Sequence, residues 1–101
     1  MKGTNPTKSD REFWDRLAQL GCVACRKDGE FNQHVSIHHI EGRTRPGAHR
    51  KVLALCAGHH QDGTGAPGLI AVHPWKTKFQ QRYGNQLDLL AECVQLLESH
   101  D

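Results

Sequence analysis

Apolar residues recur at helical spacing in the first part of the chain. Phe13, Leu17 and Leu20 lie four and three positions apart with polar residues between them, as in a helix with one buried face. The segment from Ser9 to Glu12 matches a capping box, in which a serine hydroxyl and a glutamate carboxylate satisfy the first amide groups of a helix. Because glycine commonly ends a helix, the pattern predicts a helix that begins near Ser9 and stops at Gly21.

Two shorter segments have the pattern of strands. Val35 to Ile40 alternate and are rich in β-branched residues, and Val52 to Leu55 form a continuous apolar run. The loop between them is rich in glycine, proline and arginine, so the two segments are predicted to form a hairpin. One or two helical turns should follow, from Ala57 to about Asp62. The glycine-rich segment 63–68 lacks the Gly-Lys-Ser/Thr ending of a phosphate-binding loop and is predicted to be a turn.

An aromatic stripe predicts another helix after this turn. Pro74 suits a first helical position, and Trp75, Phe79 and Tyr83 follow at intervals of four until Gly84. Such a stripe is more typical of a core face than of a surface on which bases stack.

The last part of the chain predicts a final helix over residues 85–100, with Asn85 as its cap. Its spacing predicts a buried apolar face made by Leu87, Leu90, Ala91, Val94 and Leu97. Cys93 lies on the same helix without a partner at ligand spacing, and we expect it to be a small core residue.

The composition fits one α+β domain that spans residues 1–101. With 37% hydrophobic residues and a mean hydropathy of −0.66, the chain can bury only a modest core and needs further stabilisation. The predicted core covers about residues 22–75, between the first helix and a C-terminal helix over 85–100. Residues 1–8 are predicted to be a flexible arm.

Cysteine spacing and hydropathy indicate a cytoplasmic protein. Three of the four cysteines lie in zinc-type spacings, which favour metal binding over disulfides. The opening residues lack an apolar signal segment. The longest apolar run, Val52 to Ala57, is far too short to cross a bilayer, so we expect no membrane segment.

Metal-type ligands occur at three places along the chain: Cys22 with Cys25, His38 with His39, and Cys56 with His59 and His60. A Cys-x-x-Cys pair and a Cys-x-x-His pair together close a tetrahedral Zn²⁺ site. Both His59 and His60 are within reach, and the spacing favours His59 because Cys-x-x-His mirrors Cys-x-x-Cys. His60 would then point about 100° further around the helix, toward the histidines of the strand.

A DNA-reading zinc finger is a rival interpretation of the first three ligands. Cys22, Cys25 and His38 have its spacing, but residues 42–44 contain no histidine to complete it. The cysteine pair is therefore predicted to close onto Cys56 and the following turn. A lone histidine is commonly a core or surface residue, but two adjacent histidine pairs beside zinc-type cysteines favour a second, incompletely liganded cation.

Positive charge is concentrated between the second and third ligand groups. The net charge is only +2, yet the segment 42–52 carries Arg43, Arg45, Arg50 and Lys51 and no acidic residue. A solvated loop is the simplest interpretation of such a run. Its position between histidine pairs favours DNA-phosphate binding by these four residues.

These motifs resemble a known family. A strand with His-His, a basic loop, a strand that ends in Leu-Cys, and Cys-x-x-His-His on a helix resemble the ββα-metal core of HNH endonucleases over about residues 22–62. The segments Gly42-Arg43-Thr44-Arg45-Pro46 and Gly68-Leu69-Ile70-Ala71-Val72-His73-Pro74 further resemble the phage-derived Ref family of recombination-enhancement nucleases.

The resemblance implies roles for the remaining histidines. His39 would be the general base, and His38, His60 and His73 would hold a second divalent cation, Mg²⁺, Mn²⁺ or Zn²⁺, beside a structural Zn²⁺. The implied activity is metal-dependent hydrolysis of DNA during recombination, with DNA and a RecA–DNA filament as partners and no small-molecule substrate.

Two points depart from the family pattern. The middle Asn of the HNH name is replaced by Lys51, so the residue that orients His39 is open. Adjacent strand residues point to opposite faces, so His38 and His39 can share a site only at a strand end or bulge. Two alternatives therefore stand beside the nuclease: a non-catalytic zinc-stabilised module that binds DNA, and a protein–protein adaptor on the same fold.

Overall fold

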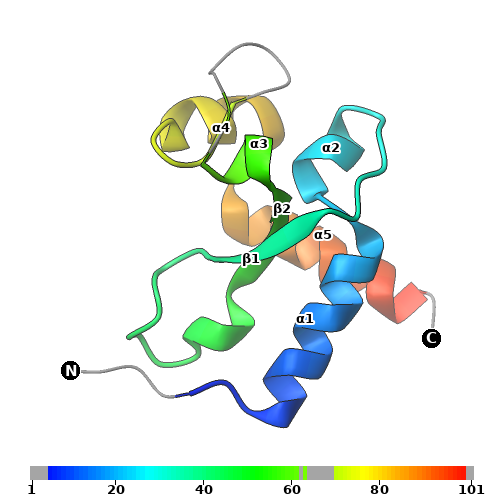
Figure 1. Cartoon of the computed structure of the whole chain (residues 1–101), viewed down its shortest axis with the longest axis vertical. Helices are drawn as coiled ribbons and strands as arrows, with labels where there is room; N and C mark the ends of the chain where they lie inside the picture. The colour runs from blue at the N-terminus through cyan, green and yellow to red at the C-terminus, as the bar shows by residue number, and fades with distance from the viewer. Residues whose placement is uncertain (1–4, 62, 64–69, 100–101) are drawn as a thin grey trace.

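The computed structural model describes residues 5–61, 63 and 70–99. Within them the elements follow in the order α1 (Lys8–Leu20), α2 (Val23–Lys27), β1 (Val35–His39), the 3₁₀ helix η1 (Ala48–Arg50), β2 (Val52–Cys56), α3 (Ala57–His60), α4 (Lys76–Tyr83) and α5 (Gln86–Ser99) (Figure 1). A two-stranded sheet surrounded by helices confirms the predicted α+β class. The predicted turn at 63–68 and the end of the preceding helix at Asp62 lie largely outside the described residues.

Helix α1 begins two residues earlier than its sequence pattern predicts. The capping box is formed by Thr7, whose Oγ1 accepts a hydrogen bond from Asp10 N at 3.0 Å, and by the Asp10 carboxylate, which accepts from Thr7 N at 2.9 Å. Thr7 and Ser9 both start a suitable four-residue pattern, and Ser9 instead contacts Arg50. The predicted arm is shortened accordingly.

The predicted helix end at Gly21 is confirmed, and a close backbone approach explains the glycine. Its φ is +85°, and a Cβ there would lie 2.9 Å from the Asn32 carbonyl oxygen. The same oxygen accepts a hydrogen bond from Cys22 N at 2.8 Å, which fixes the start of α2.

The hairpin is the centre of the fold. Strands β1 and β2 pair antiparallel, with Val35 opposite Cys56 and His39 opposite Val52. All five residues of β2 are buried, because α1, α2, α3 and α5 all contact this strand. Figure 1 shows α1 and α5 crossing near the hairpin, with α4 close to α3.

Helix α4 starts later than predicted. Pro74 is not its first residue: the His73–Pro74 peptide is cis, and the helix begins at Lys76 with Trp75 at its N-cap. Phe79 and Tyr83 are buried, as the aromatic stripe predicts.

Helix α5 is capped as predicted but turns a different face inward. Asn85 Oδ1 accepts a hydrogen bond from Leu87 N at 2.9 Å. The buried residues are Gln86, Leu89, Cys93 and Leu97, so only Leu97 of the predicted face is buried and Leu87 is 43% exposed. The prediction of this face was wrong because α5 has apolar residues at helical spacing on two sides. None of the helices in the described part of the chain is long and apolar enough to cross a membrane.

Candidate metal centres

Four buried side chains meet where the hairpin joins α2 and α3. The sulfur atoms of Cys22, Cys25 and Cys56 and a ring nitrogen of His59 all lie within 4.8 Å of one another. Cys22 and Cys25 come from the turn that starts α2, and Cys56 and His59 from the end of β2 and from α3. These are the four residues that the Cys-x-x-Cys and Cys-x-x-His spacings select, and His59 rather than His60 faces the cysteines.

The distances in this Cys₃His cluster match the edges of a tetrahedron. Cys25 Sγ and Cys56 Sγ are 3.7 Å apart, and His59 Nδ1 lies 3.5, 3.5 and 3.1 Å from the sulfur atoms of Cys22, Cys25 and Cys56. An ion bound at about 2.3 Å from sulfur and about 2.0 Å from nitrogen gives S–S edges of about 3.8 Å and S–N edges of about 3.5 Å. The cluster can therefore hold a metal such as zinc.

The electrostatics of the cluster also fit a cation. Burial raises the pKa of the Cys22 and Cys25 thiols, and for Cys25 the neighbouring sulfur atoms of Cys22 and Cys56 add to the effect. Three thiolates so close together require a compensating positive charge, and a metal ion supplies it while displacing the thiol protons.

A chain of hydrogen bonds behind the cluster orients His59. Its Nε2 lies 3.1 Å from the Tyr83 hydroxyl, which donates to Asp28 Oδ2 at 2.7 Å. Arg82 Nη2 donates to the other Asp28 oxygen at 2.9 Å. Burial raises the pKa of Tyr83 to about 12, so the hydroxyl keeps its proton. Because the Tyr83 hydroxyl donates its hydrogen bond to Asp28, its oxygen accepts one from His59 Nε2–H. The lone pair of His59 Nδ1 is then directed at the cysteines. The sequence predicted Tyr83 only as a core residue.

Replacing Tyr83 with phenylalanine tests this chain of hydrogen bonds. The substitution removes one oxygen and leaves the ring buried, so the fold should survive. Loss of a partner behind a metal ligand typically weakens metal binding about 10- to 100-fold. We expect a decrease of this size in zinc affinity, measured by competition with a chromogenic chelator. Unchanged affinity would mean that packing alone holds His59.

Three histidines form a second group on the other side of α3. Ligand atoms of His38, His60 and His73 lie within 4.8 Å of one another, and their ring centroids are 5.0 to 5.4 Å apart. His38 is buried, His60 is half-buried and His73 is exposed. This histidine trio therefore opens to solvent on one side, as a metal site that admits substrate must.

Backbone hydrogen bonds bring His73 to this group. Val72 N donates to the His59 carbonyl at 2.8 Å, and His73 N donates to the His60 carbonyl at 3.0 Å. The segment before α4 thus lies alongside α3. This contact places His73 next to a residue 13 positions earlier in the sequence.

Gln86 fixes the ring of His38. Its Oε1 lies 2.7 Å from His38 Nε2, and its own side chain is 2% exposed. An amide oxygen only accepts, so Nε2 carries the hydrogen and Nδ1 keeps its lone pair. Burial lowers the pKa of His38 to about 4, so the ring is neutral at physiological pH and suited to bind a cation. Nothing in the sequence pattern singled out Gln86.

His39 lies outside the histidine trio. Its Nε2 is 3.0 Å from His49 Nδ1, and its ring packs edge-on to Trp14 at 5.5 Å between centroids. Trp14 Nε1 donates to the His49 carbonyl at 2.7 Å, which anchors this pair to α1. Burial, together with Arg43 and His49, lowers the pKa of His39. The sequence left open which residue orients His39, and in the structure His49 is within hydrogen-bond distance of its ring.

A family model matches nearly the whole chain. The model for recombination enhancement, RecA-dependent nuclease, covers residues 6–98. The chain belongs to this family. The resemblance to Ref nucleases is thereby confirmed, and membership in the family implies a nuclease role in recombination, with DNA and RecA involved in general.

The basic segment at residues 42–52 is divided by tertiary contacts. Arg50 Nε pairs with Asp10 Oδ1 at 3.0 Å, and its guanidinium lies over the Phe13 ring. Lys51 Nζ pairs with Glu41 at 3.1 Å. Arg43 and Arg45 are exposed. The four residues predicted to bind DNA therefore differ in their surroundings: Arg50 and Lys51 have acidic partners that lie outside the segment 42–52, and the other two are exposed.

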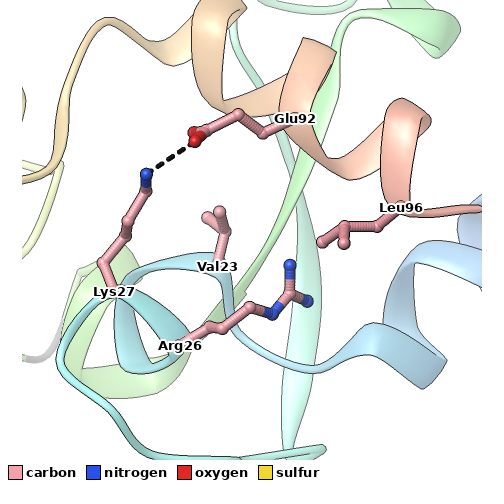
Figure 2. Close-up of a pocket in the computed structure, with 5 residues that line it drawn as sticks. All are labelled: Val23, Arg26, Lys27, Glu92 and Leu96. Atoms are coloured by element: carbon pink, nitrogen blue, oxygen red, sulfur yellow. Dashed lines mark hydrogen bonds and ion pairs between the residues drawn. The ribbon is translucent and has the colours of Figure 1, made fainter.

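The nuclease also has a pocket of about 300 Å³ between α2 and α5 (Figure 2). Lys27 Nζ and Glu92 Oε1 form an ion pair across it at 2.7 Å, and Val23, Arg26 and Leu96 complete its lining. Arg26 Nη2 donates to the Leu20 carbonyl at 2.7 Å. The Lys27–Glu92 pair joins α2 to α5, the Arg26 contact joins α2 to α1, and none of the lining residues belongs to either metal-type cluster.

Proposed function

We propose that this member of the family is a metal-dependent HNH-type endonuclease that hydrolyses DNA phosphodiester bonds during recombination. The histidine trio carries the proposal. His38, His60 and His73 supply three donors that open to solvent, close to a separate Cys₃His cluster that is closed and buried. A closed four-ligand site suits a structural role, and an open three-ligand site suits catalysis.

The proposed roles follow from the positions of the side chains. His38, His60 and His73 would hold Mg²⁺, Mn²⁺ or Zn²⁺, and imidazole ligands favour the transition metals among these. When bound, such an ion stabilises the charge that grows on the scissile phosphate and on the leaving oxygen. Cys22, Cys25, Cys56 and His59 would hold the structural zinc.

His39 is the proposed general base, with His49 as its positioning residue. A base at neutral pH must be unprotonated, and the lowered pKa of His39 favours that state. When His39 Nε2–H donates to His49 Nδ1, the Nδ1 atom of His39 carries the lone pair that takes a proton from the attacking water.

A cleavage assay tests the proposed function. Purified protein is incubated with plasmid and single-stranded DNA, in Mg²⁺, Mn²⁺ or Zn²⁺, with and without RecA. We expect cleavage that needs an added divalent ion beyond the tightly held zinc. Binding without cleavage under all conditions would instead favour the non-catalytic DNA-binding module, and absence of both would favour the adaptor.

The salt dependence of DNA binding tests the basic segment. Each phosphate contact contributes roughly 0.9 to the slope of log affinity against log salt on duplex DNA. Arg45→Gln should lower that slope by about this amount, and Arg43→Gln likewise, since both side chains are exposed.

Lys51→Gln is the matched single-charge control for these two variants. Lys51 already pairs with Glu41, so its loss should leave the slope unchanged. Equal slopes for Arg45→Gln and the parent would remove Arg45 from the DNA interface.

A further inference from the structure

The C-terminal helix α5 has apolar side chains on two faces. One face packs into the core through Leu89, Cys93 and Leu97. The other carries Leu87, Leu90, Ala91 and Val94, at positions i, i+3, i+4 and i+7. A helix that packs on one core needs only one apolar stripe, so the second stripe calls for another explanation.

The second stripe, residues 87, 90, 91 and 94, is exposed at Leu87 and Ala91, while Leu90 also packs against the edge of the core. Leu87 is 43% exposed and Ala91 is exposed, with Leu90 and Val94 half-buried. Together with Gln95 and Glu98 they line a shallow hollow of about 550 Å³. We call this surface the outer face of α5. The outer face of α5 starts close to the histidine trio, because Gln86, the residue before Leu87, is hydrogen-bonded to His38.

We propose that the outer face of α5 is the surface with which this nuclease docks on RecA in a RecA–DNA filament. The inference rests on the proposed function, since it names the partner that brings the histidine trio to DNA. The family description supplies the dependence on RecA, and the charge and size of the face support this partner.

The charge of α5 disfavours two other partners. Over Gln86–Ser99 the helix carries Asp88, Glu92 and Glu98 and no lysine, arginine or histidine. An acidic surface repels DNA phosphates. Glu92 is already paired with Lys27 of α2, so Asp88 and Glu98 are the acidic residues that two packed copies of α5 would bring together without a compensating cation on the helix. The face therefore suits a protein surface that combines apolar and basic side chains.

The size of the face favours a partner that is held in place by a second contact. A helix of 14 residues is about 21 Å long, and with a width of roughly 10 Å its face covers on the order of 200 Å². A stable interface needs about 800 Å² from each partner. A RecA filament does not require so large an interface on α5, because the DNA that RecA coats would bind the nuclease as well. Two weak contacts with one assembly reinforce each other.

The test uses the full chain with Leu87→Gln and Ala91→Gln, two neutral changes at exposed helical positions that keep good helix propensity. Asp15→Gln, at an exposed position on α1, is the control. Binding is measured to RecA filaments on single-stranded DNA and to the same DNA without RecA, beside melting temperature and sedimentation.

We expect the parent and the control to bind the filament more tightly than naked DNA. The double variant should lose at least about tenfold in filament affinity, with unchanged melting and unchanged naked-DNA binding. Filament affinity equal to that of the parent would overturn the proposal. A parent that sediments as a dimer, and becomes a monomer in the variant, would instead assign the face to a second copy of the chain. Filament binding is measured without cleavage. A catalytically inactive parent would therefore contradict the proposed function, while the filament-binding result would still test the docking surface.

Discussion

The Cys56→Ala variant is expected to be unfolded or aggregated at neutral pH, and strong chelation of the parent is expected to have the same result. Structural zinc contributes about 10–16 kcal/mol in small zinc-binding peptides. That is comparable to or larger than the 5–15 kcal/mol by which a typical domain is stable. Cys56 also lies in β2, the fully buried strand, so a collapsed cluster would disturb the centre of the core. Circular dichroism and zinc content measured together check this expectation.

Cys93 offers a matched control for the Cys56 experiment. It is also a buried cysteine, 4% exposed, but it lies on α5 away from the Cys₃His cluster. Cys93→Ala removes one sulfur atom from the core and should cost about 1–2 kcal/mol through the small cavity that remains. Its zinc content should equal that of the parent. A Cys56→Ala chain that lacks zinc yet melts like the Cys93→Ala chain would contradict the assignment of a structural zinc site.

The His39→Ala variant is expected to stay folded, to keep both metals and to cleave DNA about 10²- to 10⁴-fold more slowly, which is the usual effect of losing a general base. His38→Ala should lose cleavage for another reason, because it removes a buried member of the histidine trio and weakens the second metal site. Cleavage rates measured beside calorimetric metal titrations separate these two causes.

His34→Ala is the control for the histidine variants, since His34 is exposed and belongs to neither metal-type group. It should match the parent in rate and metal content. His49→Ala should leave metal binding intact and lower the rate through His39. If His39→Ala cleaves at the parental rate, the base is another group. If it loses the second metal, His39 is a ligand in spite of its contact with His49.

The short motifs of the sequence determined the part of the site that depends on local geometry. Cys-x-x-Cys and Cys-x-x-His each place two donors within one turn of chain, so their spacing alone predicted which four residues would meet and that His59 would face the cysteines. Gly21 was equally local, because a helix end at positive φ needs glycine. The hairpin followed from two apolar segments and the loop between them.

Tertiary packing decided the features that join distant residues. The buried face of α5 depended on which of two similar apolar stripes packed against β2 and α1. Helical periodicity alone does not distinguish the two stripes. The ion pair of Arg50 with Asp10 spans 40 positions and divides a basic segment that has uniform charge in the sequence.

The surroundings of the histidines were also set by packing. Gln86 reaches His38 across 48 positions, and Tyr83 reaches His59 across 24. His39, the last residue of β1, pairs with His49 on the side where α1 supplies Trp14. The sequence thus determined which residues can bind metal. Only the folded chain determined the neighbours that fix their tautomers and pKa values, because those neighbours are brought together by burial of a core rather than by spacing along the chain.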